Sequence, residues 1–222
     1  MNYEVLWDKL SEFLMVEQCG WQLYRVVADR TGDPELKDRY EEFGRETDRH
    51  RTILSGLIRD LGGDPDYVSP TARLAQAKSE ALLQSALVSG PLSPAEREAN
   101  DLENVLLAET KDHADWELLG QLAEQLPKGK VRAAIEAAVA EVEPQEDEHL
   151  GWAQTKLATL GLQAIMGQAP APAPDRLDEC VIQPELKIKQ VHPAPMDKRS
   201  LLEGAKLPAT EPTPASRTST GA

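Results

Sequence analysis

Residues 41–65 read EEFGRETDRHRTILSGLIRDLGGDP, and this one stretch contains the features that decide the fold of the chain. Its apolar side chains return every three or four residues, which is the spacing of one face of an α-helix. The stretch ends in Gly-Gly-Asp-Pro, whose glycines and proline favour a backbone that cannot continue a helix. Glu46 and His50 lie one turn apart on the same face as apolar residues. The stretch therefore predicts a helix with polar groups on its buried face.

The same periodicity extends over most of the chain before Gly161, and no segment alternates polar and apolar residues as a β-strand does. Long helices are predicted over residues 3–30, 34–61, 93–126 and 131–160, the last one interrupted or kinked at Pro144. Residues 64–92 are expected to be a long connection with its own short helix at 71–88. Ser93-Pro94-Ala95-Glu96 forms a capping box, which fixes the start of the third long helix.

These elements predict an all-α protein. Two helical hairpins joined by one long crossover that contains a short helix fit a four-helix bundle with the connectivity of ferritin-like proteins. An ordinary up-down bundle fits the same pattern, because the connecting helix can instead pack over one end of the bundle. Both arrangements stay open at the level of the sequence.

The composition of the 222 residues changes at Gly167. All ten aromatic side chains lie between Tyr3 and Trp152, so residues 1–167 are expected to form the helical domain. Residues 168–222 contain nine of the sixteen prolines and equal numbers of acidic and basic side chains, which places the whole net charge of −14 on the first 167 residues. This Pro/Ala-rich tail is expected to be largely disordered, because it cannot bury enough apolar surface to offset its ordering entropy.

The charge and the residue types exclude several classes of protein. An acidic chain opposes a surface that follows nucleic-acid phosphates. No apolar stretch approaches the roughly 20 residues that span a bilayer, and the first residues lack the pattern of a secretory signal, so a cytoplasmic location without a membrane is expected. Cys19 and Cys180 provide neither a disulfide framework nor a four-thiolate site and are predicted to be reduced thiols. The tryptophans at 7, 21, 116 and 152 are interpreted as core or interface residues.

Acidic side chains interrupt the apolar face of every long helix, and a histidine accompanies them in three of the four. These residues are Glu17 in the first helix, Glu46 and His50 in the second, Glu109 and His113 in the third, and Glu146 and His149 in the fourth. Counted from the turns near Gly32 and Lys128, the groups within each hairpin lie level to about one turn, or ~5 Å of rise. One central site is therefore geometrically available.

The chemistry of such a site follows from what a protein interior tolerates. Uncompensated buried charges are costly unless they become neutral or meet cations. Two divalent ions balance four carboxylates in formal charge, and mixed carboxylate and imidazole ligation suits iron, with manganese as the alternative. The rival interpretation is a purely structural acidic bundle, in which each Glu–His pair is a solvated pair on a helix surface.

Four stretches carry a resemblance to the ferritin-like superfamily, in its stress-associated and rubrerythrin-like small-bundle branches. They are VEQCGWQLYR at 16–25, the stretch at 41–65, ETKDHADWELLGQLAE at 109–124 and EPQEDEHLGWAQTKL at 143–157. The resemblance covers roughly residues 3–162. It implies a di-iron centre that reacts with dioxygen or hydrogen peroxide, as a ferroxidase or a peroxidase does in stress protection.

The resemblance also assigns residues. Glu17 matches the single glutamate of the family's first helix, and Glu146 with His149 matches the Glu-x-x-His motif of the fourth. In the second helix Thr47 stands three residues before His50, so Glu46 would have to ligate from the four-residue spacing. In the third helix Glu109 is favoured and Asp112 is the alternative. The chain has no Cys-x-x-Cys motif, so it encodes no rubredoxin-type electron-transfer domain.

Two partners are expected besides the metal. An apolar helix face is expected to pair two copies of the chain as a homodimer. The second functional hypothesis is a metal-free acidic helical bundle that acts as an interaction module through residues 168–222. In that case VIQPELKIKQVHPAPMDKRSLLEGAKLP at 181–208 would be a linear motif that becomes ordered when it binds a protein partner.

Overall fold

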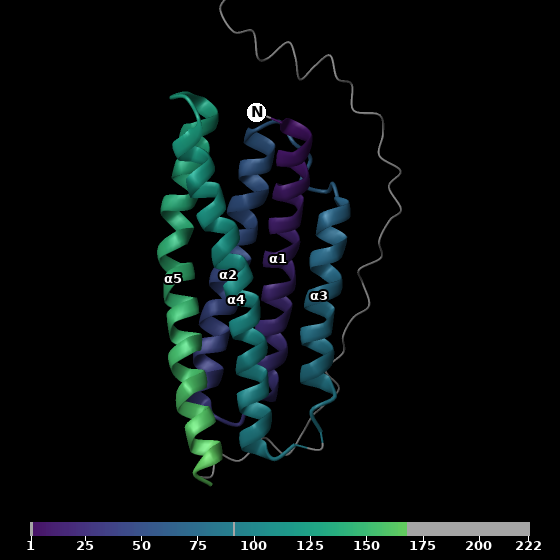
Figure 1. Cartoon of the computed structure of the whole chain (residues 1–222), viewed down its shortest axis with the longest axis vertical. Coiled ribbons are helices and arrows are strands. Elements are labelled where there is room, and N and C mark those ends of the chain that lie inside the picture. Colours follow the sequence, from purple (N-terminus) through teal and green to yellow (C-terminus); the bar gives the residue numbers. More distant parts are fainter. Residues whose placement is uncertain (1, 91, 168–222) are drawn as a thin grey trace, which may run out of the picture. The chain divides into compact units, whose positions relative to one another are not determined.

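The computed structural model describes residues 2–90 and 92–167, which form five α-helices (Figure 1). The helices are α1 (Tyr3–Arg30), α2 (Pro34–Asp60), α3 (Pro70–Leu87), α4 (Pro94–Gln125) and α5 (Lys130–Ile165). The described residues contain no strand, so the predicted all-α class is confirmed. The predicted disordered tail at 168–222, with Cys180, lies outside the described residues. Among the helices that are described, none is long and apolar enough to cross a membrane.

The helices α1 to α4 begin where the sequence supplies a side-chain cap, whereas α5 follows Gly129 and has none. Asn2, Asp33, Ser69 and Ser93 each accept a hydrogen bond from a backbone N–H of the first turn that follows. Ser93 and Glu96 form the predicted reciprocal capping box, in which the Ser93 N–H donates to Glu96 Oε2 at 2.9 Å. These caps satisfy donors that have no partner inside a helix, so the bounds of α1 to α4 follow closely from local sequence.

Pro144 lies inside α5, which continues through it to Ile165. Of the two alternatives predicted at Pro144, an interruption or a kink, the interruption is therefore wrong. Pro144 lies two residues before Glu146. Its ring nitrogen has no hydrogen to donate to the carbonyl of Ala140, so α5 lacks that one helical hydrogen bond.

Four of the helices pack as a closed ring of neighbours. α1 packs against α2 and α4, and α5 packs against the same two helices from the other side (Figure 1). The fifth helix, α3, packs against α1 and α4 only. The ring places the inward faces of α1, α2, α4 and α5 against one another.

The connection between α2 and α4 runs along the length of α1. At its start, Ser69 Oγ donates to the carbonyl of Asp8, in the first turns of α1, at 3.0 Å. At its end, Arg30 Nη2, in the last turn of α1, donates to Ser89 Oγ at 2.6 Å. α3 therefore carries the chain from one end of α1 to the other, and the connection does not stay at one end.

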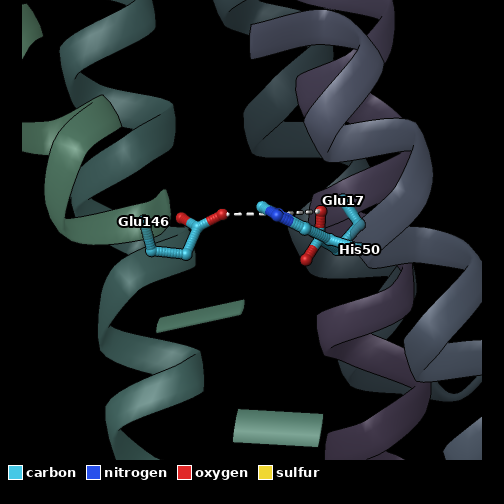
Figure 2. A group of neighbouring side chains, drawn as sticks. All are labelled: Glu17, His50 and Glu146. Atoms are coloured by element: carbon cyan, nitrogen blue, oxygen red, sulfur yellow. Dashed lines mark ion pairs between the residues drawn. The ribbon is translucent and has the colours of Figure 1, made fainter. Parts of the chain in front are cut away.

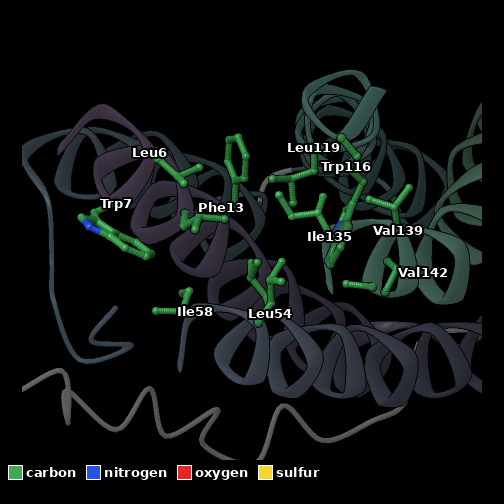
Figure 3. Close-up of a cluster of buried hydrophobic side chains, with 14 residues drawn as sticks. Leu6, Trp7, Phe13, Leu54, Ile58, Trp116, Leu119, Ile135, Val139 and Val142 are labelled. Atoms are coloured by element: carbon green, nitrogen blue, oxygen red, sulfur yellow. The ribbon is translucent and has the colours of Figure 1, made fainter. Parts of the chain in front are cut away.

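The buried apolar residues between these helices form two separate clusters. The first cluster draws on residues 6–13 of α1, 54–58 of α2, 116–123 of α4 and 135–142 of α5 (Figure 3). The second draws on residues 23–28 of α1, 36–43 of α2, 102–105 of α4, and Ala153 and Leu160 of α5. Each of the four helices passes through both clusters, and in the segment between them each helix carries at least one fully buried acidic or histidine side chain or, in α4, acids no more than 5% exposed.

Candidate metal centre

Six buried ionisable side chains lie between the two apolar clusters, and together they are called the polar layer below. They are Glu17 from α1, His50 from α2, Glu109 and Asp112 from α4, and Glu146 and His149 from α5, each no more than 3% exposed. Acids and histidines are seldom so deeply buried unless each finds a compensating partner. The contacts among these six residues therefore determine what the layer can bind.

Glu17, His50 and Glu146 form the first of two triads. Nδ1 of His50 lies 2.8 Å from Oε1 of Glu146 and 3.9 Å from Oε2 of Glu17. Figure 2 shows Glu146 reaching from one side toward His50 and Glu17 on the other. The three side chains come from three helices, and they offer ligand atoms within 4.8 Å of one another.

Glu109, Glu146 and His149 form the second triad, with the same spread of ligand atoms. Nδ1 of His149 lies 3.4 Å from Oε2 of Glu109 and 3.8 Å from Oε1 of Glu146. Glu146 belongs to both triads. The helical spacing of three residues places it on the same face of α5 as His149, which is what the Glu-x-x-His pattern requires.

An aromatic donor from a neighbouring helix holds one oxygen of each outer glutamate. Trp116 Nε1 on α4 donates to Oε1 of Glu17 on α1 at 2.7 Å. In the reverse direction, the hydroxyl of Tyr24 on α1 donates to Oε1 of Glu109 on α4 at 2.8 Å. These crossed contacts fix both carboxylates and leave the second oxygen of each turned toward a histidine.

Both histidines are held in the same way through Nε2. The Nε2–H of His50 donates to Oε1 of Gln145 at 2.6 Å, and that of His149 donates to Oε2 of Glu46 at 2.8 Å. A proton held on Nε2 leaves the lone pair of a neutral imidazole on Nδ1. In each triad that Nδ1 is the atom that faces the carboxylates.

The atoms that face the middle of the two triads make no hydrogen bond outside the polar layer; their nearest polar neighbours are one another, and the closest pair is Nδ1 of His50 with Oε1 of Glu146 at 2.8 Å. The six atoms are Oε2 of Glu17, Nδ1 of His50, Oε2 of Glu109, both carboxylate oxygens of Glu146 and Nδ1 of His149. A buried polar atom without a partner is unfavourable by about 1–3 kcal/mol, and more if it is charged. Six such atoms pointing at one another form an arrangement that bound cations would satisfy.

Burial raises the proton affinity of the carboxylates in the layer. The pKa of Glu17 lies well above its ordinary value because burial and then the nearby Glu146 disfavour its charged form. Burial likewise raises the pKa of Glu146, while His50 opposes the rise. The pKa of His149 is raised to about 9: burial acts against the rise, and the hydrogen bond and charge of Glu109 outweigh it. Without metal, the layer therefore takes up protons in place of metal cations.

Asp112 adds a fourth buried carboxylate one turn after Glu109. Its Oδ1 has no hydrogen-bond partner among the described residues. Burial raises its pKa well above the ordinary value, and the charges of Glu17, Glu146 and Glu109 add to the effect. Asp112 is in neither triad, so the structure gives it a place in the layer beside Glu109 rather than in exchange for it.

The donor set contains oxygen and imidazole nitrogen. The thiol of Cys19 is buried and belongs to neither triad. Carboxylate and imidazole ligands suit iron and manganese, whereas thiolate-seeking metals prefer sulfur. Each triad supplies three protein ligands, which leaves coordination positions for water or substrate. The residues therefore fit the pair of divalent ions expected from the sequence.

Five of the seven candidate ligands come together in the triads: Glu17, His50, Glu109, Glu146 and His149. Glu46 and His113 do not. Glu46 lies behind His149, with its side chain 30% exposed. His113 lies near the surface, 2.8 Å from the carboxylate of Asp147.

Both differences have the same physical cause. Residues on the buried face of a helix follow one another at spacings of three or four. In α2 and in α4 the spacing predicted from the sequence differs from the spacing in the structure. From Phe43, α2 buries Thr47 rather than Glu46. From Glu109, α4 buries Asp112 rather than His113. Thr47 brings no carboxylate, and its hydroxyl donates to the carbonyl of Phe43 at 2.9 Å.

The sequence did not predict the four residues that hold the candidate ligands by hydrogen bonds: Trp116, Tyr24, Gln145 and Glu46. Trp116 and Tyr24 lie on the predicted buried faces, one or two turns from a candidate ligand, and aromatic residues that can donate a hydrogen bond usually find a partner when buried. That rule could have signalled both. Gln145 gave no such signal, because it lies beside the buried face of α5.

The chain was also compared with known proteins. No protein-family model, no curated protein and no solved structure matches it.

Proposed function

We propose that this chain is a ferritin-like four-helix bundle that binds two divalent metal ions, one at each triad, with Glu146 shared between them. The observation that carries the proposal is the set of six buried polar atoms that converge from four helices and have no hydrogen-bond partner outside the layer. The closed ring of α1, α2, α4 and α5, with a crossover along α1, supports the bundle. The oxygen and nitrogen donors favour iron, with manganese as the alternative.

The proposed activity is oxidation of ferrous iron, or removal of peroxide, in protection against oxidative stress. A bound iron pair would supply two-electron chemistry: two ferrous ions, one hydrogen peroxide molecule and two protons give two ferric ions and two water molecules. The chain's own residues orient the ligands and keep water out. The ring of Phe43 lies 4.1 Å from that of His149, and apolar clusters close the layer on both sides.

The charge of the layer supports a pair of divalent ions even though Thr47 brings no carboxylate. Glu17, Glu109, Asp112 and Glu146 together carry four negative charges when ionised, which two divalent ions balance. Asp112 on α4 thus supplies the fourth negative charge, because α2 brings no carboxylate into the layer. We assign it this electrostatic role and not that of a ligand.

Metal content of variants tests the proposal, with surface residues of the same type as controls. The full chain would be purified with chelator, loaded anaerobically with ferrous iron, freed of excess metal and measured by elemental analysis. Wild type should hold about two ions per chain. His149→Ala should hold about one or fewer, and Glu146→Gln should lose most of both. His113→Ala and Glu148→Gln, which change an imidazole and a carboxylate outside the triads, should match wild type.

A structural role for the same residues predicts a different result. If the triads were only buried ion pairs, wild type would retain less than about half an ion per chain, and the variants would change stability alone. Loading with manganese in parallel identifies the preferred metal, and the rate of ferrous oxidation by dioxygen or peroxide shows whether there is turnover. The homodimer, the cytoplasmic location and a protein partner for residues 168–222 stay predictions.

A further inference from the structure

The two histidines of the polar layer differ in the partner behind them. His149 donates its Nε2–H to a carboxylate, Glu46 Oε2, at 2.8 Å. His50 donates its Nε2–H to an amide oxygen, Gln145 Oε1, at 2.6 Å. Both imidazoles are fully buried, and both present Nδ1 to the carboxylates of the layer.

A carboxylate behind an imidazole changes the nitrogen on its far side. The negative charge strengthens the hydrogen bond at Nε2, pulls positive charge onto the ring and makes Nδ1 a stronger donor to a metal ion. A neutral amide fixes the tautomer and the orientation of the ring but has a weaker effect on basicity. His149 is therefore the better ligand of the two.

In the remainder of the two triads the same kinds of chemical group recur. Each contains one outer glutamate, Glu17 or Glu109, with one oxygen held by an aromatic donor and the other oxygen free. Both share Glu146. The Nε2 partner is thus the clearest chemical difference between them. The charge of Asp112 acts on both outer glutamates, so only single substitutions behind the histidines isolate this difference.

We propose that the two metal positions are unequal: the position at Glu109 and His149 fills first and holds its ion more tightly, and Glu46 sets this order. The inference rests on the proposed function, because it concerns the same pair of ions. The position at Glu17 and His50 is then the one that exchanges its ion. Glu46 is a positioning residue, since it acts through His149 and belongs to neither triad.

Stepwise titration with Mn²⁺ tests this order in the full chain, by calorimetry without oxidant. Wild type should show two steps, the first at least about 10-fold tighter than the second. His50→Ala should remove the weaker step and leave the tighter one, and His149→Ala should do the reverse. Glu46→Gln, which keeps the size of the side chain and removes its charge, should weaken the first step by about 10- to 100-fold and bring the two steps together.

The reciprocal variant is expected to bind more tightly, and a folding defect would not produce such a gain of affinity. Gln145→Glu places a carboxylate behind His50 without removing the acceptor, and it should strengthen the second step. Glu148→Gln, an exposed carboxylate on the same helix, is the control and should leave both steps unchanged. Helix content by circular dichroism confirms that each variant folds.

Three results would overturn the inference while leaving the proposed function intact. They are two equal steps in wild type, loss of the tighter step in His50→Ala, and a Glu46→Gln titration that matches wild type or weakens both steps equally. Absence of any binding in wild type would instead contradict the proposed function itself. The two failures are therefore distinguishable in one experiment.

Discussion

Tyr24 and Tyr40 are both buried tyrosines, but their hydroxyls meet different surroundings. The hydroxyl of Tyr24 donates to Glu109 at 2.8 Å, whereas that of Tyr40 has no hydrogen-bond partner among the described residues. The rings pack together, with centroids 6.2 Å apart. The same substitution at the two positions therefore separates the contribution of the hydrogen bond to stability from the contribution of the ring.

Tyr24→Phe should lower the free energy of unfolding by about 1–3 kcal/mol, because it leaves a buried carboxylate oxygen without its donor. It should also weaken metal binding, since Glu109 is no longer held in place. Tyr40→Phe should be neutral or slightly stabilising, because it removes a hydroxyl that has no partner. Urea denaturation and Mn²⁺ titration measure both effects. Equal losses in the two variants would contradict the role given to Tyr24.

Residue by residue, the sequence predicted a buried acid correctly where apolar neighbours constrained the helix face. In α1, Phe13 and Tyr24 flank Glu17 on a face that is buried throughout. In α2 and α4 both of the adjacent positions that could lie on the buried face carry polar side chains. A step of three or four residues then fits the pattern equally well, and the sequence could not choose between Glu46 and Thr47, or between His113 and Asp112.

At the scale of single elements, Pro144 is an unusual feature of α5. A proline in a helix interior removes one hydrogen bond and crowds the carbonyl four residues earlier. Pro144 is exposed, so nothing in its packing offsets this cost. Because it lies two residues before Glu146, it affects the local backbone from which this side chain, common to both triads, projects.

Pro144→Ala should raise the free energy of unfolding by about 1–3 kcal/mol, because alanine restores the N–H and favours helix. Pro94 provides the control. It occupies the first turn of α4, where a missing N–H has no cost, so Pro94→Ala should leave stability unchanged or slightly lower. Thermal denaturation of both variants without metal measures the difference. A loss of stability in Pro144→Ala would show that the proline is favourable where it stands.

The helices were more predictable than their arrangement, for a physical reason. Local caps such as Ser93 with Glu96 determine where a helix begins, and such contacts involve neighbouring residues. The path of α3 depends instead on contacts between distant residues, such as Ser69 with Asp8 and Arg30 with Ser89. No periodicity within residues 64–92 contains that information, so the sequence left two connections open.

For the whole molecule, buried ionisable groups link stability to pH. The carboxyl groups of Glu17 and Asp112 have pKa values well above the ordinary range, and burial raises the pKa of Asp115 to about 6. A carboxyl group with a raised pKa binds its proton more tightly in the folded state, so its contribution to stability falls as pH rises through the folded pKa. His149, with a pKa raised to about 9, is stabilising below its ordinary value of 6.5 and loses that effect through 9.

The metal-free protein should therefore lose stability from about pH 5.5 to about pH 8.5, because all four groups act in the same direction. Divalent metal should reverse the trend, since its binding displaces protons and strengthens as pH rises. Urea denaturation at three pH values, with chelator and then with Mn²⁺, measures both. Glu12 and Glu96, whose pKa values are lowered, act in the opposite direction only below about pH 4.5, outside this window. Stability that rises with pH in chelator would contradict the prediction.

The division of the apolar core into two clusters has a consequence for the cooperativity of unfolding. Each cluster is a hydrophobic unit that could melt by itself, and the layer between them is the part of the protein whose cohesion depends on what is bound there. With ions in place, the two ends of the molecule should unfold in one transition. Without them, amide hydrogen exchange should find two regions with separate opening free energies, and the metal would then determine whether this chain behaves as one folding unit or as two.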